Sequence, residues 1–213
     1  MKYRIGPEPE LLKEIGQIMV NYSACEHAIH SIFRAVMSLD EQQTYLLVSK
    51  ANLNAEKMVG VIKSELHRIR PLSLHESILS GLTDFTKSIP KRNTIAHWQW
   101  AVTTDQAGMA TNSLKAKPGQ DIETRDYSLK DLQLISWEIA RATVLLTSAA
   151  TMIRGVARQA LAGNDWVGNR YEFDSDILNE LIQYSIDRTR KFITDYEADN
   201  FPIEQPPSSD KSR

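Results

Sequence analysis

The sequence is almost free of cysteine, since Cys25 is the only one among 213 residues. A single thiol forms no intramolecular disulfide, and the lack of cysteine pairs excludes the common zinc motifs. Because Cys25 lies among apolar residues, we expect a buried structural thiol rather than a nucleophile. These features predict a protein of a reducing compartment, the cytoplasm.

Long hydrophobic runs are also missing. The longest candidate, Val144 to Ile153, is interrupted by Thr and Ser and falls short of the about 20 residues that a membrane span needs. Met1 to Pro7 contains no apolar core of a signal peptide. We therefore expect a soluble protein with no membrane partner.

An excess of positive charge is absent too. Lys and Arg total 25 against 27 Asp and Glu, so any contact with RNA needs a local basic patch. No glycine-rich phosphate loop, His-Glu-x-x-His or nucleophile elbow is present. His27 and His30 could present two metal ligands on one helix, but no third ligand is evident, and an ordinary helix-surface pair or a buried helix edge is favoured. We predict no metal and no cofactor.

What the sequence does contain is apolar residues at helical spacing. One stripe runs from Leu11 to Val36 behind Pro7 and Pro9, and another from Leu132 to Ile153. Cap residues mark several helix starts, including Asp40, Asn52 or Asn54, and a capping box at 128–131; Pro71 ends a helix and a further one begins near Ser73.

The segment between these helices is less regular. Near Pro90, either Ser88 caps a new helix or a longer helix kinks. Trp98, Trp100 and Val102 alternate with polar or small residues, which predicts a small β-hairpin over about 98–116, with Met109 to Leu114 as its second strand. The whole chain indicates an all-α bundle in one domain over 1–199, with a last helix after a polar loop at 164–174 and a disordered tail at 200–213.

Arg92-Asn93-Thr94-Ile95-Ala96-His97 is the segment that carries a chemical signal. Asn93 and His97 are four apart and share a helix face, whereas Arg92 must swing to join them. His exchanges protons near neutral pH, and Arg forks onto phosphate oxygens. Arg70 and His75 have the same spacing, but Pro71 breaks the helix between them.

The Arg92 to His97 motif, with polar Asn93 after the Arg, resembles that of HEPN-domain proteins. The order of helices around it fits, so the resemblance implies a HEPN-like helical bundle with the hairpin inserted after the motif helix. It implies a metal-independent endoribonuclease, a toxin or anti-phage effector that forms a homodimer with a composite site and has an antitoxin as a further partner. It is also compatible with a non-catalytic scaffold or a nucleotide- or protein-binding module.

On this reading, Arg92, Asn93 and His97 are the catalytic candidates, with Glu26 as a fourth member that positions Arg92. Lys87, Lys91 and Trp98 are candidates for binding RNA, with Lys115 and Lys117 on the same rim. Trp98 and Trp100 could stack on unpaired bases, although packing of the hairpin against the helices is favoured. The alternative for His97 is a structural histidine at a helix end.

Overall fold

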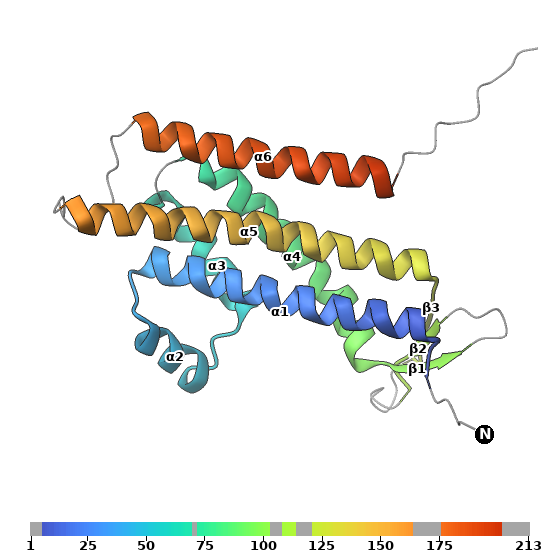
Figure 1. The fold of residues 1–213 in the computed structure, drawn as a ribbon. Helices are drawn as coiled ribbons and strands as arrows, with labels where there is room; N and C mark the ends of the chain where they lie inside the picture. The colour runs from blue at the N-terminus through green and yellow to red at the C-terminus, as the bar shows by residue number, and fades with distance from the viewer. Residues whose placement is uncertain (1–5, 70–71, 103–107, 114–120, 164–175, 202–213) are drawn as a thin grey trace, which may run out of the picture.

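The computed structural model describes residues 6–69, 72–102, 108–113, 121–163 and 176–201, and most of them are helical (Figure 1). The α-helices are α1 (Pro9–Met37), α2 (Glu41–Lys50), α3 (Ala55–Glu65), α4 (Leu74–His97), α5 (Leu129–Gly163) and α6 (Asp176–Asn200), and a 3₁₀ turn, η1 (Leu66–Arg68), follows α3. The mostly helical prediction is confirmed. The loop predicted at 164–174 and nearly all of the predicted tail lie outside the described residues.

Helices α2, α3 and α5 begin at cap residues that the sequence analysis identified. The side chains of Asp40 and Asn54 accept hydrogen bonds from the backbone N–H three residues later, at 2.7 and 3.0 Å. At the start of α5, the Ser128 hydroxyl accepts from the N–H of Asp131, and the Asp131 carboxylate accepts from the N–H of Ser128. Each pair satisfies N–H groups that a helix leaves unpaired at its first turn.

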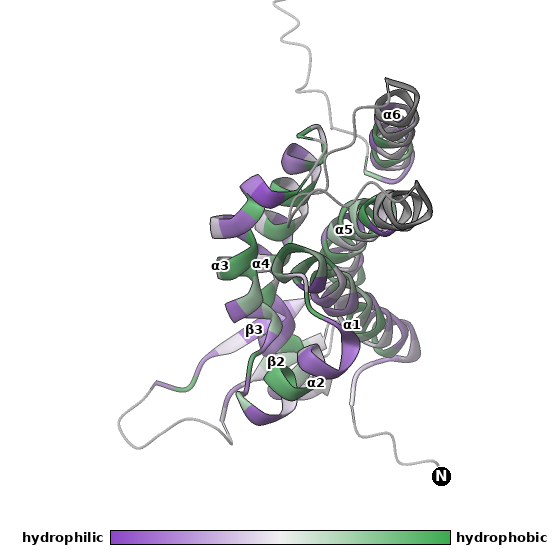
Figure 2. Ribbon diagram, turned by 90° about the vertical axis from the view of Figure 1, so that its left-hand side faces the viewer, coloured by the Kyte–Doolittle hydropathy of each residue, from purple (hydrophilic) through white to green (hydrophobic). Residues whose placement is uncertain are grey.

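The helices pack around α5. Figure 1 shows α1 and α5 side by side and running in the same direction, α6 returning along the other side of α5, and α4 crossing behind them. In Figure 2 the hydrophobic residues gather where α1, α4 and α5 face one another. Amphipathic helices bury such stripes to remove apolar surface from water.

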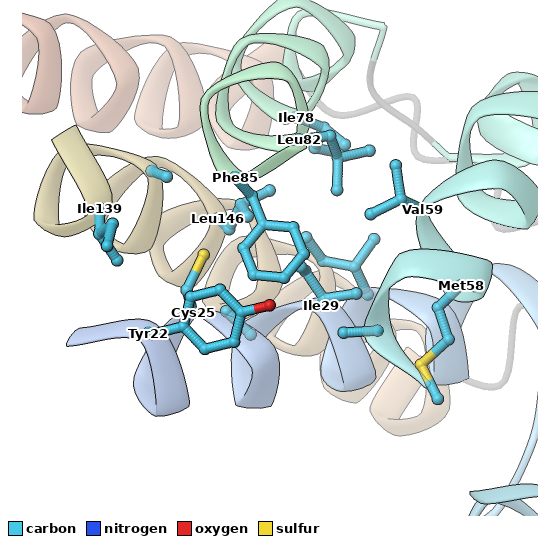
Figure 3. Close-up of a cluster of buried hydrophobic side chains, with 14 of the residues drawn as sticks. Tyr22, Cys25, Ile29, Met58, Val59, Ile78, Leu82, Phe85, Ile139 and Leu146 are labelled. Atoms are coloured by element: carbon cyan, nitrogen blue, oxygen red, sulfur yellow. The ribbon is translucent and has the colours of Figure 1, made fainter. Parts of the chain in front are cut away.

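Tyr22, Cys25 and Phe85 lie at the centre of this core, where α1 meets α4 (Figure 3). The rings of Tyr22 and Phe85 stack with centroids 5.1 Å apart. Burial raises the pKa of the Cys25 thiol to about 12, so it stays protonated at neutral pH. The expectation of a structural thiol rather than a nucleophile is therefore supported.

Helix α4 continues through Pro90 as a single helix. Of the two alternatives near Pro90, the cap of a new helix at Ser88 is wrong, because that hydroxyl donates to the carbonyl of Phe85 at 2.7 Å and lies inside the helix. Thr94 donates its hydroxyl to the carbonyl of Pro90 at 3.1 Å. Arg92, Asn93 and His97 consequently occupy the last turns of one long helix.

The predicted hairpin is part of a three-stranded antiparallel sheet in the order β1 (Gln99–Val102), β2 (Gly108–Thr111) and β3 (Thr124–Tyr127). The pairing of β1 with β2 is confirmed, but β2 ends before the predicted Leu114. The third strand was missed. Its first three residues are polar and exposed, so it carries no alternation of apolar residues that a sequence pattern could detect.

Gly60 and Gly81 both lie in helices, and we expect their replacement by alanine to change the free energy of unfolding in opposite directions. A Cβ at Gly81 would lie 2.7 Å from Cγ of Leu146 in the interface of α4 and α5, whereas a Cβ at Gly60 meets nothing within 4 Å. We expect Gly81→Ala to lower the free energy of unfolding by about 1–3 kcal/mol through overpacking. Gly60→Ala should raise it by about 0.5–1 kcal/mol, because alanine restricts the unfolded chain. Urea unfolding of both variants checks this, and stabilisation by Gly81→Ala would contradict the close approach of the two helices.

Candidate functional site

The Arg92 guanidinium lies against α1 near the C-terminal end of α4. Its Cζ atom is 4.6 Å from the centroid of the Tyr22 ring, and its Nη1 donates to the side-chain oxygen of Asn93 at 3.2 Å. Its Nε is buried and has no hydrogen-bond partner among the described residues. The aromatic face and the Asn93 amide together restrict the orientation of the guanidinium.

Glu26 lies one helical turn after Tyr22 on α1 and interacts electrostatically with Arg92. Burial raises the pKa of the Glu26 carboxyl, and the positive charge of Arg92 opposes that rise. Burial, with the nearby Glu26, raises the pKa of the Tyr22 hydroxyl to about 12, so the ring that supports Arg92 stays neutral. The structure therefore places Asn93 in contact with Arg92 and Glu26 close enough to interact electrostatically with it, and the positioning role of Glu26 stays a prediction.

His97 is the last residue of α4, and its side chain is exposed. Asn93 is exposed on the turn before it. Residues four apart on a helix have Cβ atoms about 5–6 Å from each other, so the two side chains extend from one face. The imidazole is thus not enclosed in the core of the protomer.

The structure describes only part of the basic rim predicted around the motif. Lys87 is exposed, but Lys91 forms an ion pair with Glu138 of α5. Lys115 and Lys117 lie outside the described residues. Among Lys87, Lys91 and Arg92, Lys87 is exposed, whereas the other two are half-buried.

Trp98 and Trp100, which follow α4, make different contacts. Trp100 donates its indole N–H to the carbonyl of Ile95 at 2.9 Å, and its ring lies 5.5 Å from that of Tyr127, so it packs the sheet against α4 as the favoured alternative predicted. Trp98 is half-buried and has the guanidinium of Arg125 at 5.2 Å from its ring. Base stacking on Trp98 would require Arg125 to move or to join the contact.

Sequence reasoning missed two residues of this region. Tyr22 was noted with Glu26 as a polar interruption of the apolar stripe, four residues apart on one face of α1, but its contact with Arg92 was not predicted. Glu138 is 47 residues from its partner Lys91, and no local pattern connects them. A contact at that separation appears only once the helices are packed.

The described residues contain no group of three His, Cys, Asp or Glu side chains arranged to hold a metal ion. His30 is half-buried, and burial, followed by the neighbouring His27, lowers the pKa of its imidazole from the usual 6.5. The pair therefore fits a partly buried helix edge.

The lowered pKa of His30 predicts a loss of stability in mild acid. Between pH 6.5 and the lower folded pKa, the unfolded chain binds a proton at His30 that the folded chain does not. This contribution to stability is complete above pH 6.5 and falls as the pH drops through that window. We expect His30→Gln to flatten this part of the profile, which urea unfolding midpoints between neutral pH and mild acid would measure. An unchanged slope would show that other groups dominate it.

Comparisons with known proteins add no assignment: no family model, no curated protein and no solved structure matches this chain. Within the part of the chain that the structure describes, no helix is both long enough and apolar enough to cross a membrane.

Proposed function

We propose that this chain is a metal-independent endoribonuclease of the HEPN type. The observation that supports it best is the position of Arg92, whose guanidinium lies over the Tyr22 ring, donates to Asn93 and interacts electrostatically with Glu26, five residues before an exposed His97. Such an arrangement places a fixed cation and a proton-transfer group at one helix end. The resemblance of the motif to HEPN-domain proteins supplies the reaction class.

In the proposed reaction the 2′-hydroxyl of RNA attacks the adjacent phosphorus. His97 accepts the proton of that hydroxyl, the P–O5′ bond breaks, and the products carry a 2′,3′-cyclic phosphate and a 5′-hydroxyl. Arg92 donates to the phosphate oxygens as their negative charge grows in the transition state. Asn93 contacts Arg92 and orients it or the phosphate, and Glu26 is a positioning residue that acts through Arg92.

The reaction also needs an acid to protonate the leaving 5′-oxygen. One imidazole cannot serve as base and acid at the same instant, so a homodimer would bring a second His97 to the same phosphate. Lys87 would attract the RNA backbone. The proposed setting is the cytoplasm, where a toxin or anti-phage effector of this kind would be restrained by an antitoxin.

The direct test is the chemistry of the products in EDTA. A structured RNA should be cut into fragments that end in a 2′,3′-cyclic phosphate, and the same RNA with 2′-deoxy substitutions should resist at the substituted positions. Cleavage of the deoxy-substituted positions, or activity that requires a divalent metal, would overturn the proposed mechanism.

A second candidate is a non-catalytic binding module. The internal contacts of Arg92 with Tyr22 and Asn93 favour it, because they also suit an arginine that only stabilises the junction of α1 and α4. Absence of cleavage over a broad panel of RNAs by a folded protein would favour this function.

A further inference from the structure

A cavity of about 420 Å³ opens between α1, α5 and α6, on residues that the proposed ribonuclease site does not use. Small-molecule pockets in proteins usually measure about 300–1,000 Å³, so the volume suits a compact ligand. Glu14, Gln17 and Asn21 line it from α1, at the helical spacing that places them on one face.

The polar wall of the cavity is built by side-chain amides. The Gln17 amide nitrogen donates to Asn21 Oδ1 at 2.8 Å, and the Asn21 amide nitrogen lies within 3.3 Å of both the carbonyl and the hydroxyl of Ser136. These bonds fix Asn21 and leave the Gln17 side-chain oxygen available. Gln133, on α5, is exposed and its amide makes no hydrogen bond within the described residues, so it offers a donor and an acceptor together.

Another part of the lining is aromatic. The rings of Trp137 and Tyr196 stack at 4.1 Å, and the indole N–H of Trp137 donates to Glu197, which holds the pair in place. Tyr196 remains 39 % exposed, so part of its surface is open to a ligand, and Phe201 lines the same side. Aromatic surfaces of this kind stack on planar heterocycles.

The charge of the lining selects against phosphate. None of the described residues that line the cavity is Lys, Arg or His, and Glu14 supplies a carboxylate. A phosphate or carboxylate ligand would find no cation there and would face that negative charge. A negatively charged ligand such as a nucleotide is therefore disfavoured.

We propose that this cavity binds an amino-substituted nucleobase, as the free base or its nucleoside. An amide of Gln pairs with both the exocyclic amine and a ring nitrogen of adenine, which the amide of Gln133 can do while Tyr196, in the same lining, stacks on the ring. An unpaired adenine within an RNA strand offers the same edge, but its phosphates add negative charge at a cavity that already contains Glu14. The free nucleoside is accordingly the ligand that the lining favours, and this inference does not depend on RNA cleavage.

Equilibrium dialysis of the full chain with labelled adenosine, in the absence of RNA, tests the proposal. We expect saturable binding at or below about 1 mM, and binding of AMP or of a short oligoadenylate that is weaker by about fivefold or more. Gln133→Ala should weaken adenosine binding about tenfold, since a paired amide is lost. The matched control is Gln42→Ala, an exposed glutamine on α2, which should leave binding unchanged.

Glu14→Gln separates the role of charge from that of shape, because it keeps the size of the side chain. This variant should narrow the difference between adenosine and AMP while adenosine itself binds as before. Three results would each overturn the proposal: no saturable adenosine binding, equal affinities of the parent protein for adenosine and AMP, or an adenosine affinity that Gln133→Ala leaves unchanged. Binding of oligoadenylate above that of adenosine would instead identify the cavity as a contact for RNA.

Discussion

His97→Ala is expected to reduce RNA cleavage by about 10²–10⁴-fold, the range that general acid–base groups contribute. The side chain is exposed at the last residue of α4, so its removal takes no group from the core. The melting temperature should therefore stay close to that of the parent. Initial rates of cleavage in EDTA, measured on matched preparations, provide the readout.

The control for this experiment is His67→Ala. His67 is also an exposed histidine, but it lies in η1, before the 24-residue helix that His97 ends. That helix is about 36 Å long at 1.5 Å per residue, so the two histidines are far apart. His67→Ala should cleave like the parent. Equal cleavage by the parent and by His97→Ala would indicate a contaminating nuclease and would remove His97 from the proposed mechanism.

The helical body of this protein could be predicted from sequence because its signals are local. Apolar residues at helical spacing and caps such as Asp40 and Asn54 act within one or two turns, and the structure has the helices that they predict. The strand Thr124–Tyr127 lacks such a signal, since it is held by pairing with β2 and exposes most of its side chains. Its existence depends on a partner strand, which a pattern within one segment does not report.

In the candidate site too, some features depend on the local sequence and others on how the helices pack. The shared face of Asn93 and His97 follows from helix geometry, whereas the continuation of α4 through Pro90 was left open by the sequence. The contact of Arg92 with Tyr22 and its electrostatic interaction with Glu26 depend on how α1 packs against α4. The ion pair of Lys91 with Glu138 depends on how α4 packs against α5. The interhelical ion pairs of Arg141 with Asp84 and Glu197, at 3.0 and 2.8 Å, are likewise products of packing. Sequence spacing identified the candidate residues of the site, and the packing determines their neighbours.

Arg92→Lys distinguishes a guanidinium that binds phosphate from a positive charge that only stabilises the helix junction. Lysine keeps the charge that faces Glu26 and can place its ammonium over the Tyr22 ring, so we expect the free energy of unfolding to change by less than about 1 kcal/mol. It lacks the planar fork that donates two parallel hydrogen bonds to phosphate. Cleavage should therefore fall by about 10²–10³-fold, as when one donor to a developing negative charge is removed.

The matched control is Arg34→Lys, a half-buried arginine in the last turn of α1, which should retain full cleavage. Urea unfolding and cleavage rates measured on the same samples separate the two roles of Arg92. A stable Arg92→Lys protein that cleaves within about threefold of the parent would show that a point charge is sufficient. Unfolding of the variant would assign Arg92 to the structure, because lysine preserves the charge but loses the packing of the buried Nε against its surroundings. Loss of cleavage in a protein of unchanged stability is the result that the proposed ribonuclease requires.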